Sequence, residues 1–203
     1  MKVVLMTSES DTFWDLSKNV RKGRPPRLNQ TNSGSLGIHC HSLERQLPEC
    51  LEMDQFQAWT GPIKDVLAGP VIEVTNFGNL IEKRGIVVEP WYLSSDLGWV
   101  RDSEAYHPLW STDALWQEVA PNDDLLESVE SADAIVAAFP SSIVLNNGGL
   151  RKLLSSSPAA AVATGGSAHA TLTLKPGCLA LRTRGVARIG ADNRQRILEW
   201  LGA

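Results

Sequence analysis

Hydroxyl groups and glycines that could bind a ligand gather in three short polar segments of the chain. These segments are Thr7-Ser-Glu-Ser-Asp-Thr12, Pro140 to Asn147, and Thr164 to His169, and each follows an apolar run. Hydroxyls together with the backbone N–H groups at a helix start can hold a phosphate, and glycines let the backbone approach a flat ligand closely. An ordinary capped helix start would explain the first segment equally well, and a tight turn alone would explain the glycines.

The apolar runs that precede these segments are typical of buried parallel strands. Because strands alternate with helices, the sequence predicts an α/β fold with a mainly parallel sheet. An open parallel sheet binds ligands at the carboxyl ends of its strands, which is where the three polar segments lie. The expected strands are Val3–Met6, Leu36–His41, Val71–Val74, Ile86–Val88, a run that begins at Ala132, and Ala159–Ala163; the expected helices are Phe13–Val20, Leu51–Leu67 with a break at Gly61-Pro62, Asp123–Ser131, Gly148–Leu154 and Ala191–Leu201.

Length and charge limit the class of protein. The 203 residues suit one domain over 1–203, with an unusual or inserted segment at about 24–122. A net charge of −4 provides no large basic field, so no nucleic-acid partner is expected, and the arginines near the C-terminus are interpreted as solvated.

Cysteine usage and the apolar runs indicate the compartment. Three cysteines without a framework pattern fit a reducing environment. The N-terminus lacks the pattern of a signal peptide, and no apolar run approaches the ~20 residues of a spanning helix. We therefore expect a cytoplasmic protein without a membrane partner.

Two motifs near the C-terminus occur together. The first is Ala132-Asp-Ala-Ile-Val136 with Pro140, Gly148, Leu150 and Arg151, and the second is Ala163-Thr-Gly-Gly-Ser-Ala-His169 with Leu174-Lys-Pro176. In these motifs the chain resembles the NAD(P)H-dependent FMN reductases of the flavodoxin-like fold, the alkanesulfonate-utilisation type most closely. The resemblance covers roughly residues 123–192.

The resemblance implies a three-layer flavodoxin-like fold and a homo-oligomer that reduces FMN with NAD(P)H for a partner monooxygenase. Hydride passes directly from nicotinamide to flavin, so the protein must orient two rings and needs no nucleophile. The FMN phosphate would lie at the first loop, and the flavin ring at the two later segments. The implied cofactor-binding residues are Ser8, Ser10, Thr12, Pro140, Ser141, Ser142, Ile143, Thr164, Gly165, Gly166 and Ser167.

Two histidine patterns offer other chemistry. His39-Cys-His41 could ligate zinc, but residues at i and i+2 of a strand share a face, so these histidines are more simply flanking residues of Cys40 and no metal site is predicted. His169-Ala-Thr171 is similar to the His-x-Thr element of two-histidine phosphoesterases, in which two histidines act as acid and base on one phosphate. His41 would be the second histidine of that alternative enzyme.

A third alternative is a non-catalytic interaction protein on the same fold. The segment from Trp91 to Trp116 is rich in tryptophan and has no clear period, and tryptophan is favoured at contact surfaces. Packed core is the more common role of such residues, and it is the interpretation preferred for this segment.

Overall fold

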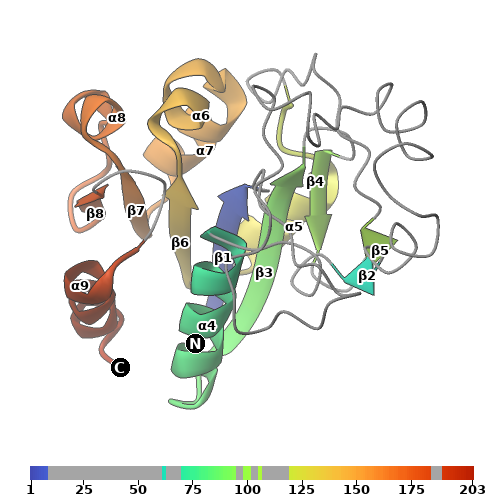
Figure 1. Cartoon of the computed structure of the whole chain (residues 1–203), viewed down its shortest axis with the longest axis vertical. Helices are drawn as coiled ribbons and strands as arrows, with labels where there is room; N and C mark the ends of the chain where they lie inside the picture. Colours follow the sequence, from blue (N-terminus) through green and yellow to red (C-terminus); the bar gives the residue numbers. More distant parts are fainter. Residues whose placement is uncertain (9–60, 63–69, 95–97, 102–104, 107–118, 184–188) are drawn as a thin grey trace, which may run out of the picture.

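A six-stranded sheet forms the centre of the computed structural model of the chain, which describes residues 1–8, 61–62, 70–94, 98–101, 105–106, 119–183 and 189–203. The strand order is β4-β3-β1-β6-β7-β8 (Figure 1). All neighbouring pairs are parallel except β3 and β4. The strands are β1 (Lys2–Ser8), β3 (Val87–Ser94), β4 (Gly98–Arg101), β6 (Ala134–Phe139), β7 (Ala160–Gly165) and β8 (Leu179–Thr183); β2 (Gly61–Pro62) and β5 (Ala105–Tyr106) pair separately.

The parallel strands follow a doubly wound order. Without the antiparallel edge strand β4, the sequence positions across the sheet read 2-1-3-4-5, which is the flavodoxin-like order. The chain leaves β1 for β3 on one side and later returns to β6 on the other, so the topological switch point lies between β1 and β6. The predicted α/β fold with a mainly parallel sheet is confirmed.

Helices bury apolar residues against both faces of this sheet. Helices α4 (Pro70–Glu82) and α9 (Ala191–Leu201) contribute to one hydrophobic cluster, with Val3 and Leu5 of β1. The other cluster contains Val4 and Met6 of β1 and receives residues from four helices. These are α5 (Asp123–Glu130), α6 (Ser141–Asn146), α7 (Gly148–Ser156) and α8 (Gly166–Thr171).

The tryptophans of β3 and β4 belong to the core. Trp91 and Trp99 are buried in the same cluster as α5, and the Trp99 ring packs edge-on against Phe139 with centroids 6.0 Å apart. The packed-core interpretation is confirmed for these two residues. Trp110 and Trp116 lie outside the described residues.

The prediction of a strand at Val71–Val74 is wrong, because these residues lie in α4. Valine and isoleucine favour strands, but the buried residues Val74, Phe77 and Ile81 recur at helical spacing and face the sheet. Pro70 suits the first position of a helix, and Gly85, with φ of 81°, turns the chain toward β3. The predicted helices at 123–131, 148–154 and 191–201 are confirmed as α5, α7 and α9.

The expected elements at Phe13–Val20, Leu36–His41 and residues 51–60 lie outside the described residues. Within the described ranges, no helix combines the length and apolar character needed to cross a bilayer.

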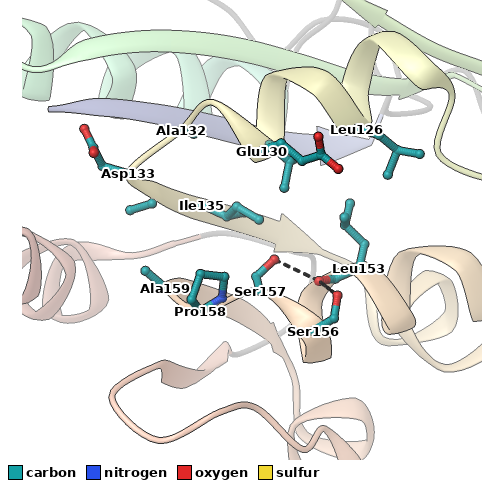
Figure 2. Close-up of a pocket in the computed structure, with 12 residues that line it drawn as sticks. Leu126, Glu130, Ala132, Asp133, Ile135, Leu153, Ser156, Ser157, Pro158 and Ala159 are labelled. Atoms are coloured by element: carbon teal, nitrogen blue, oxygen red, sulfur yellow. Dashed lines mark hydrogen bonds between the residues drawn. The ribbon is translucent and has the colours of Figure 1, made fainter.

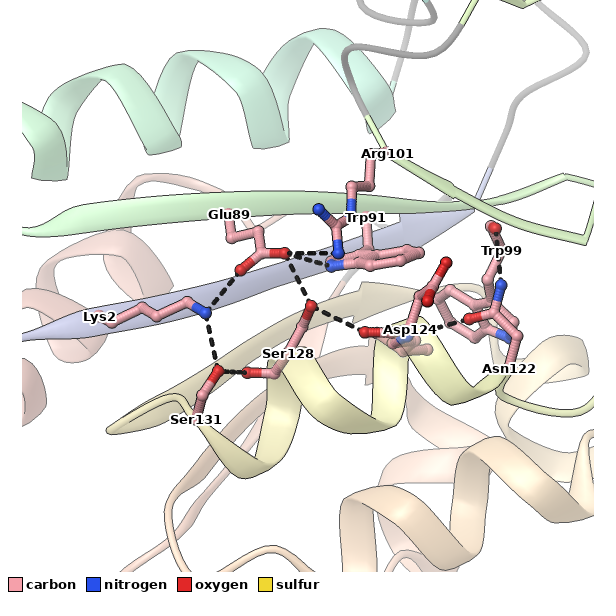
Figure 3. Close-up of polar contacts among 10 residues, drawn as sticks. Lys2, Glu89, Trp91, Trp99, Arg101, Asn122, Asp124, Ser128 and Ser131 are labelled. Atoms are coloured by element: carbon pink, nitrogen blue, oxygen red, sulfur yellow. Dashed lines mark hydrogen bonds and ion pairs between the residues drawn. The ribbon is translucent and has the colours of Figure 1, made fainter.

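A polar network joins α5 to the sheet (Figure 3). Glu89 of β3 accepts hydrogen bonds from Ser128 Oγ at 2.7 Å and Trp91 Nε1 at 3.3 Å, and its other oxygen lies 2.7 Å from Lys2 Nζ. Lys2 also donates to Ser131 Oγ at 2.8 Å. Because the partners come from β1, β3 and α5, the network fixes the helix on the sheet.

Candidate functional site

Strand register brings several of the predicted site residues to one edge of the sheet. Thr7 of β1 pairs with Ala138, and Phe139 of β6 pairs with Thr164 of β7. Ser8 ends β1, Pro140 and Ser141 follow β6, and Gly165 ends β7, so these residues share the carboxyl edge of the sheet on both sides of the switch point. Ser10 and Thr12 lie outside the described residues.

Among the residues that the structure describes, three buried hydroxyls at this edge have no hydrogen-bond partner. They belong to Ser8, Thr164 and Thr183, which are 1%, 0% and 5% exposed. The neighbouring Thr7, by contrast, donates to the Ala138 carbonyl at 2.8 Å. A buried polar group without a partner costs about 1–3 kcal/mol, and it calls for an explanation such as a bound ligand.

At the opposite edge of the sheet, the serine hydroxyls beside a cavity do have hydrogen-bond partners (Figure 2). A cavity of about 320 Å³ lies there, lined by residues of α5, α7 and the amino ends of β6 and β7. Its serine hydroxyls are satisfied, because Ser156 and Ser157 both donate to the Leu153 carbonyl, at 3.1 and 2.8 Å. Among the described residues, the buried hydroxyls without a partner therefore end the strands at the carboxyl edge.

The segment after β6 is a helix, and the expectation of a polar loop over Pro140 to Asn147 is wrong. The Pro140 carbonyl accepts hydrogen bonds from the N–H groups of Ile143 and Val144. These two bonds form the first turn of α6. Ile143 is 5% exposed and packs in the core, whereas Ser142 is exposed. Of the four site residues proposed in this segment, Pro140 and Ser141 are the ones next to the strand end.

Asn147 has a structural role at the start of α7. Its Oδ1 accepts from Leu150 N at 2.8 Å, which caps the helix, and its Nδ2 donates to the Val119 carbonyl at 2.9 Å. The side chain is 1% exposed. It therefore fixes the helix to the segment before α5.

The segment Thr164 to His169 contains the end of β7 and all but two residues of α8, so the expected loop is wrong here too. Its glycines make room for protein groups. A Cβ on Gly165 would overlap Ser141 Oγ, and a Cβ on Gly166 would lie 3.2 Å from both Nε and Nη2 of Arg182. Ser167 is exposed. The two glycines thus allow close packing between β7, α6 and β8.

This packing makes Gly165 testable. Gly165→Ala is expected to lower the free energy of unfolding by about 1 kcal/mol, because the methyl group must displace the Ser141 hydroxyl. In the Gly165→Ala/Ser141→Ala double variant the loss should be recovered, as measured by urea unfolding in a double-mutant cycle. Equal losses in the single and the double variant would show that the two residues are not in contact.

Arg182 and Thr183, which end β8 at the same edge, are not among the site residues that the sequence predicts. Thr164 pairs with Arg182, and Gly165 pairs with Thr183. The sequence predicts a solvated side chain for Arg182, and this side chain is exposed. The useful signal would have been the position of both residues directly after the short apolar run Leu179 to Leu181.

The histidines give no assembled site within the described part of the chain. His169 Nε2 lies 3.3 Å from the Ala180 carbonyl, so one ring nitrogen contacts the backbone. His39, Cys40 and His41 lie outside the described residues. Within the residues that the structure does describe, no group of three or more His, Cys, Asp or Glu side chains could hold a metal ion.

Comparison of the chain with models of protein families, with curated proteins and with solved structures found no match.

Proposed function

We propose that the chain binds FMN at the carboxyl edge of its sheet and reduces it with NAD(P)H. The observation that carries this proposal is the set of unpartnered, buried hydroxyls of Ser8, Thr164 and Thr183 at the ends of β1, β7 and β8. Buried hydroxyls in this position are expected to gain partners when a polar ligand enters. Doubly wound sheets bind such ligands at this edge, near the switch point.

The residues at the edge suit a flavin nucleotide in their chemistry. Hydroxyls can donate hydrogen bonds to the carbonyl and phosphate oxygens of FMN and accept from its N–H group. The resemblance of residues 123–192 to FMN reductases supports the same ligand. When bound, FMN supplies a ring that accepts hydride from NAD(P)H, so the task of the protein is to bind and orient two nucleotides.

Other parts of the proposal follow from the resemblance and the composition. They are a homo-oligomer, delivery of reduced flavin to a monooxygenase, and a cytoplasmic location. The mass of the purified protein in solution tests the homo-oligomer. Coupled turnover with a monooxygenase tests the delivery of reduced flavin.

The test of the proposal is titration with FMN of wild-type protein and of the Ser8→Ala and Thr164→Val variants. Each variant removes a hydroxyl that has no hydrogen-bond partner within the described part of the chain. FMN affinity should fall about 5- to 30-fold, the equivalent of 1–2 kcal/mol for a lost hydrogen bond. The free energy of unfolding should stay unchanged or rise, because the burial cost of the hydroxyl disappears.

Two matched controls use hydroxyls that are already satisfied. Ser157→Ala removes a buried serine hydroxyl at the opposite edge, and Thr7→Val removes one beside Ser8. Both should lower stability and leave FMN affinity unchanged. Anaerobic bleaching of bound flavin by NADPH or NADH would then test the reductase step. A wild-type protein that binds no flavin would refute the proposal.

A further inference from the structure

A guanidinium group lies in line with two of the unpartnered hydroxyls, those of Ser8 and Thr164. In the sheet register, Thr164 of β7 is next to Phe139 on one side and Arg182 of β8 on the other. Ser8 follows Met6 by two residues, so it points to the same face as Phe139. Ser8, Phe139, Thr164 and Arg182 therefore form a row across one face of the carboxyl edge.

The Arg182 side chain rests on Gly166. A Cβ on this glycine would be 3.2 Å from Nε and Nη2 and 3.4 Å from Cζ, so the guanidinium lies close to Gly166, where a side chain would contact it. The Arg182 carbonyl also accepts a hydrogen bond from Asn193 Nδ2 at 3.1 Å. The guanidinium thus lies beside Gly166, the residue that begins α8.

The charge of Arg182 is not neutralised by any carboxylate within the described part of the chain. The ion pairs found there involve the N-terminal amine, Lys2, Arg101 and Arg194. Among the described residues that end β1, β6, β7 and β8 at this edge, Arg182 is the cationic one. A positioned cation beside a buried hydroxyl without a partner suits an anionic ligand group.

We propose that Arg182 binds the phosphate monoester of a nucleotide at the carboxyl edge of the sheet. This inference rests on the proposed function and assigns a residue to the charged part of the ligand. A guanidinium donates two parallel hydrogen bonds to phosphate oxygens, which a neutral side chain cannot reproduce. The phosphate is either the 2′-phosphate of NADPH or the 5′-phosphate of FMN. In the second case the FMN phosphate lies at the end of β8, three strands away from the first loop to which the resemblance assigns it.

Paired titrations test this assignment and separate the two sources. The dissociation constants of FMN and riboflavin, and those of NADPH and NADH, are measured for wild-type protein and for Arg182→Gln. In wild-type protein we expect the phosphorylated member of one pair to bind more tightly by about tenfold or more. In Arg182→Gln this preference should disappear, while riboflavin and NADH bind as before. If the preference for FMN over riboflavin disappears, the phosphate that Arg182 binds is that of FMN. If the preference for NADPH over NADH disappears, it is the 2′-phosphate of NADPH.

Arg151→Gln is the matched control. Arg151 is an exposed arginine without an ion pair among the described residues, and with Lys152 and Thr173 it lines a separate cavity of about 350 Å³ beside α7. This variant should retain the phosphate preference. Gly166→Ala provides a second perturbation, because its methyl group would shift the guanidinium by a few tenths of an ångström while Arg182 itself is kept. It should weaken the preference, but less than Arg182→Gln does.

The outcomes separate this inference from the proposed function. Equal binding of both members of each pair to wild-type protein, or a preference that Arg182→Gln retains, overturns the role of Arg182 and leaves flavin binding intact. If Arg151→Gln abolishes the preference and Arg182→Gln does not, the phosphate binds in the cavity beside α7, and the role of Arg182 is again overturned. Wild-type protein that binds neither flavin overturns the proposed function and this inference together.

Discussion

Asn147→Ala is expected to lower the free energy of unfolding by about 2–4 kcal/mol, which combines the loss of a helix cap with two buried polar groups left unpaired. The alanine cannot accept from Leu150 N or donate to the Val119 carbonyl. Because Asn147 is 1% exposed, water cannot replace these bonds easily. Chemical unfolding followed by circular dichroism measures the change.

Asn122→Ala is a matched control for this prediction. Asn122 caps α5 by accepting from Leu125 N at 3.0 Å and donates to the Trp99 carbonyl at 3.2 Å, so its pattern is the same. Its side chain is exposed, however, and we expect a cost of only about 1 kcal/mol. Equal losses in the two variants would contradict the role that burial has in this account.

Glu89→Gln is expected to cost about 2 kcal/mol at neutral pH, within the range for hydrogen bonds to a charged group. Glutamine keeps an acceptor for Ser128 and Trp91 but places a neutral amide beside Lys2 Nζ.

The effect of Glu89→Gln on stability should also depend on pH. Burial acts to raise the pKa of the Glu89 carboxyl, but hydrogen bonds from Lys2 and Ser128 and the charges of Lys2 and Arg101 lower it below its ordinary value of 4.5.

The direction of the pH effect follows from this lowered pKa. A carboxyl that is more acidic in the folded state contributes stability above its unfolded pKa, and that contribution is lost as pH falls through the folded value. The stability difference between wild-type and Glu89→Gln should therefore be constant from pH 7 to about 5 and shrink below pH 4.5. Thermal unfolding across this range measures it, with Glu82→Gln, an exposed residue of α4, as the control. A difference independent of pH would contradict the ionic role of Glu89.

Apolar content made the central strands and the longer helices predictable. β1, β6 and β7 contain continuous buried runs, and α9 presents Ile197, Leu198 and Leu201 at helical spacing. The six-residue helices α6 and α8 were not predicted, because so short a segment carries little periodicity. At α4 the β-branched residues indicated a strand, and the tertiary contacts of Phe77 and Ile81 decided otherwise.

The candidate site was predictable only in its location. The rule that ligands bind at the carboxyl ends of parallel strands predicts one shared edge for Ser8, Ser141 and Thr164, and the structure places these three residues at one edge. It could not reveal that Asn147 is a buried cap, since asparagine before two glycines also suits a turn. Nor could it reveal that Gly166 accommodates a guanidinium, because that contact depends on the register of β7 and β8.

The central claim is that FMN binds at the carboxyl edge, and chemical-shift mapping of the backbone amides during an FMN titration tests it most directly. We expect saturable shifts at Ser8, Ser141, Gly165 and Gly166, which share this edge. The amides of Asp133 and Ala159, beside the cavity at the opposite edge, should not move. Shifts confined to that opposite edge, or no shifts at saturating FMN, would contradict the account.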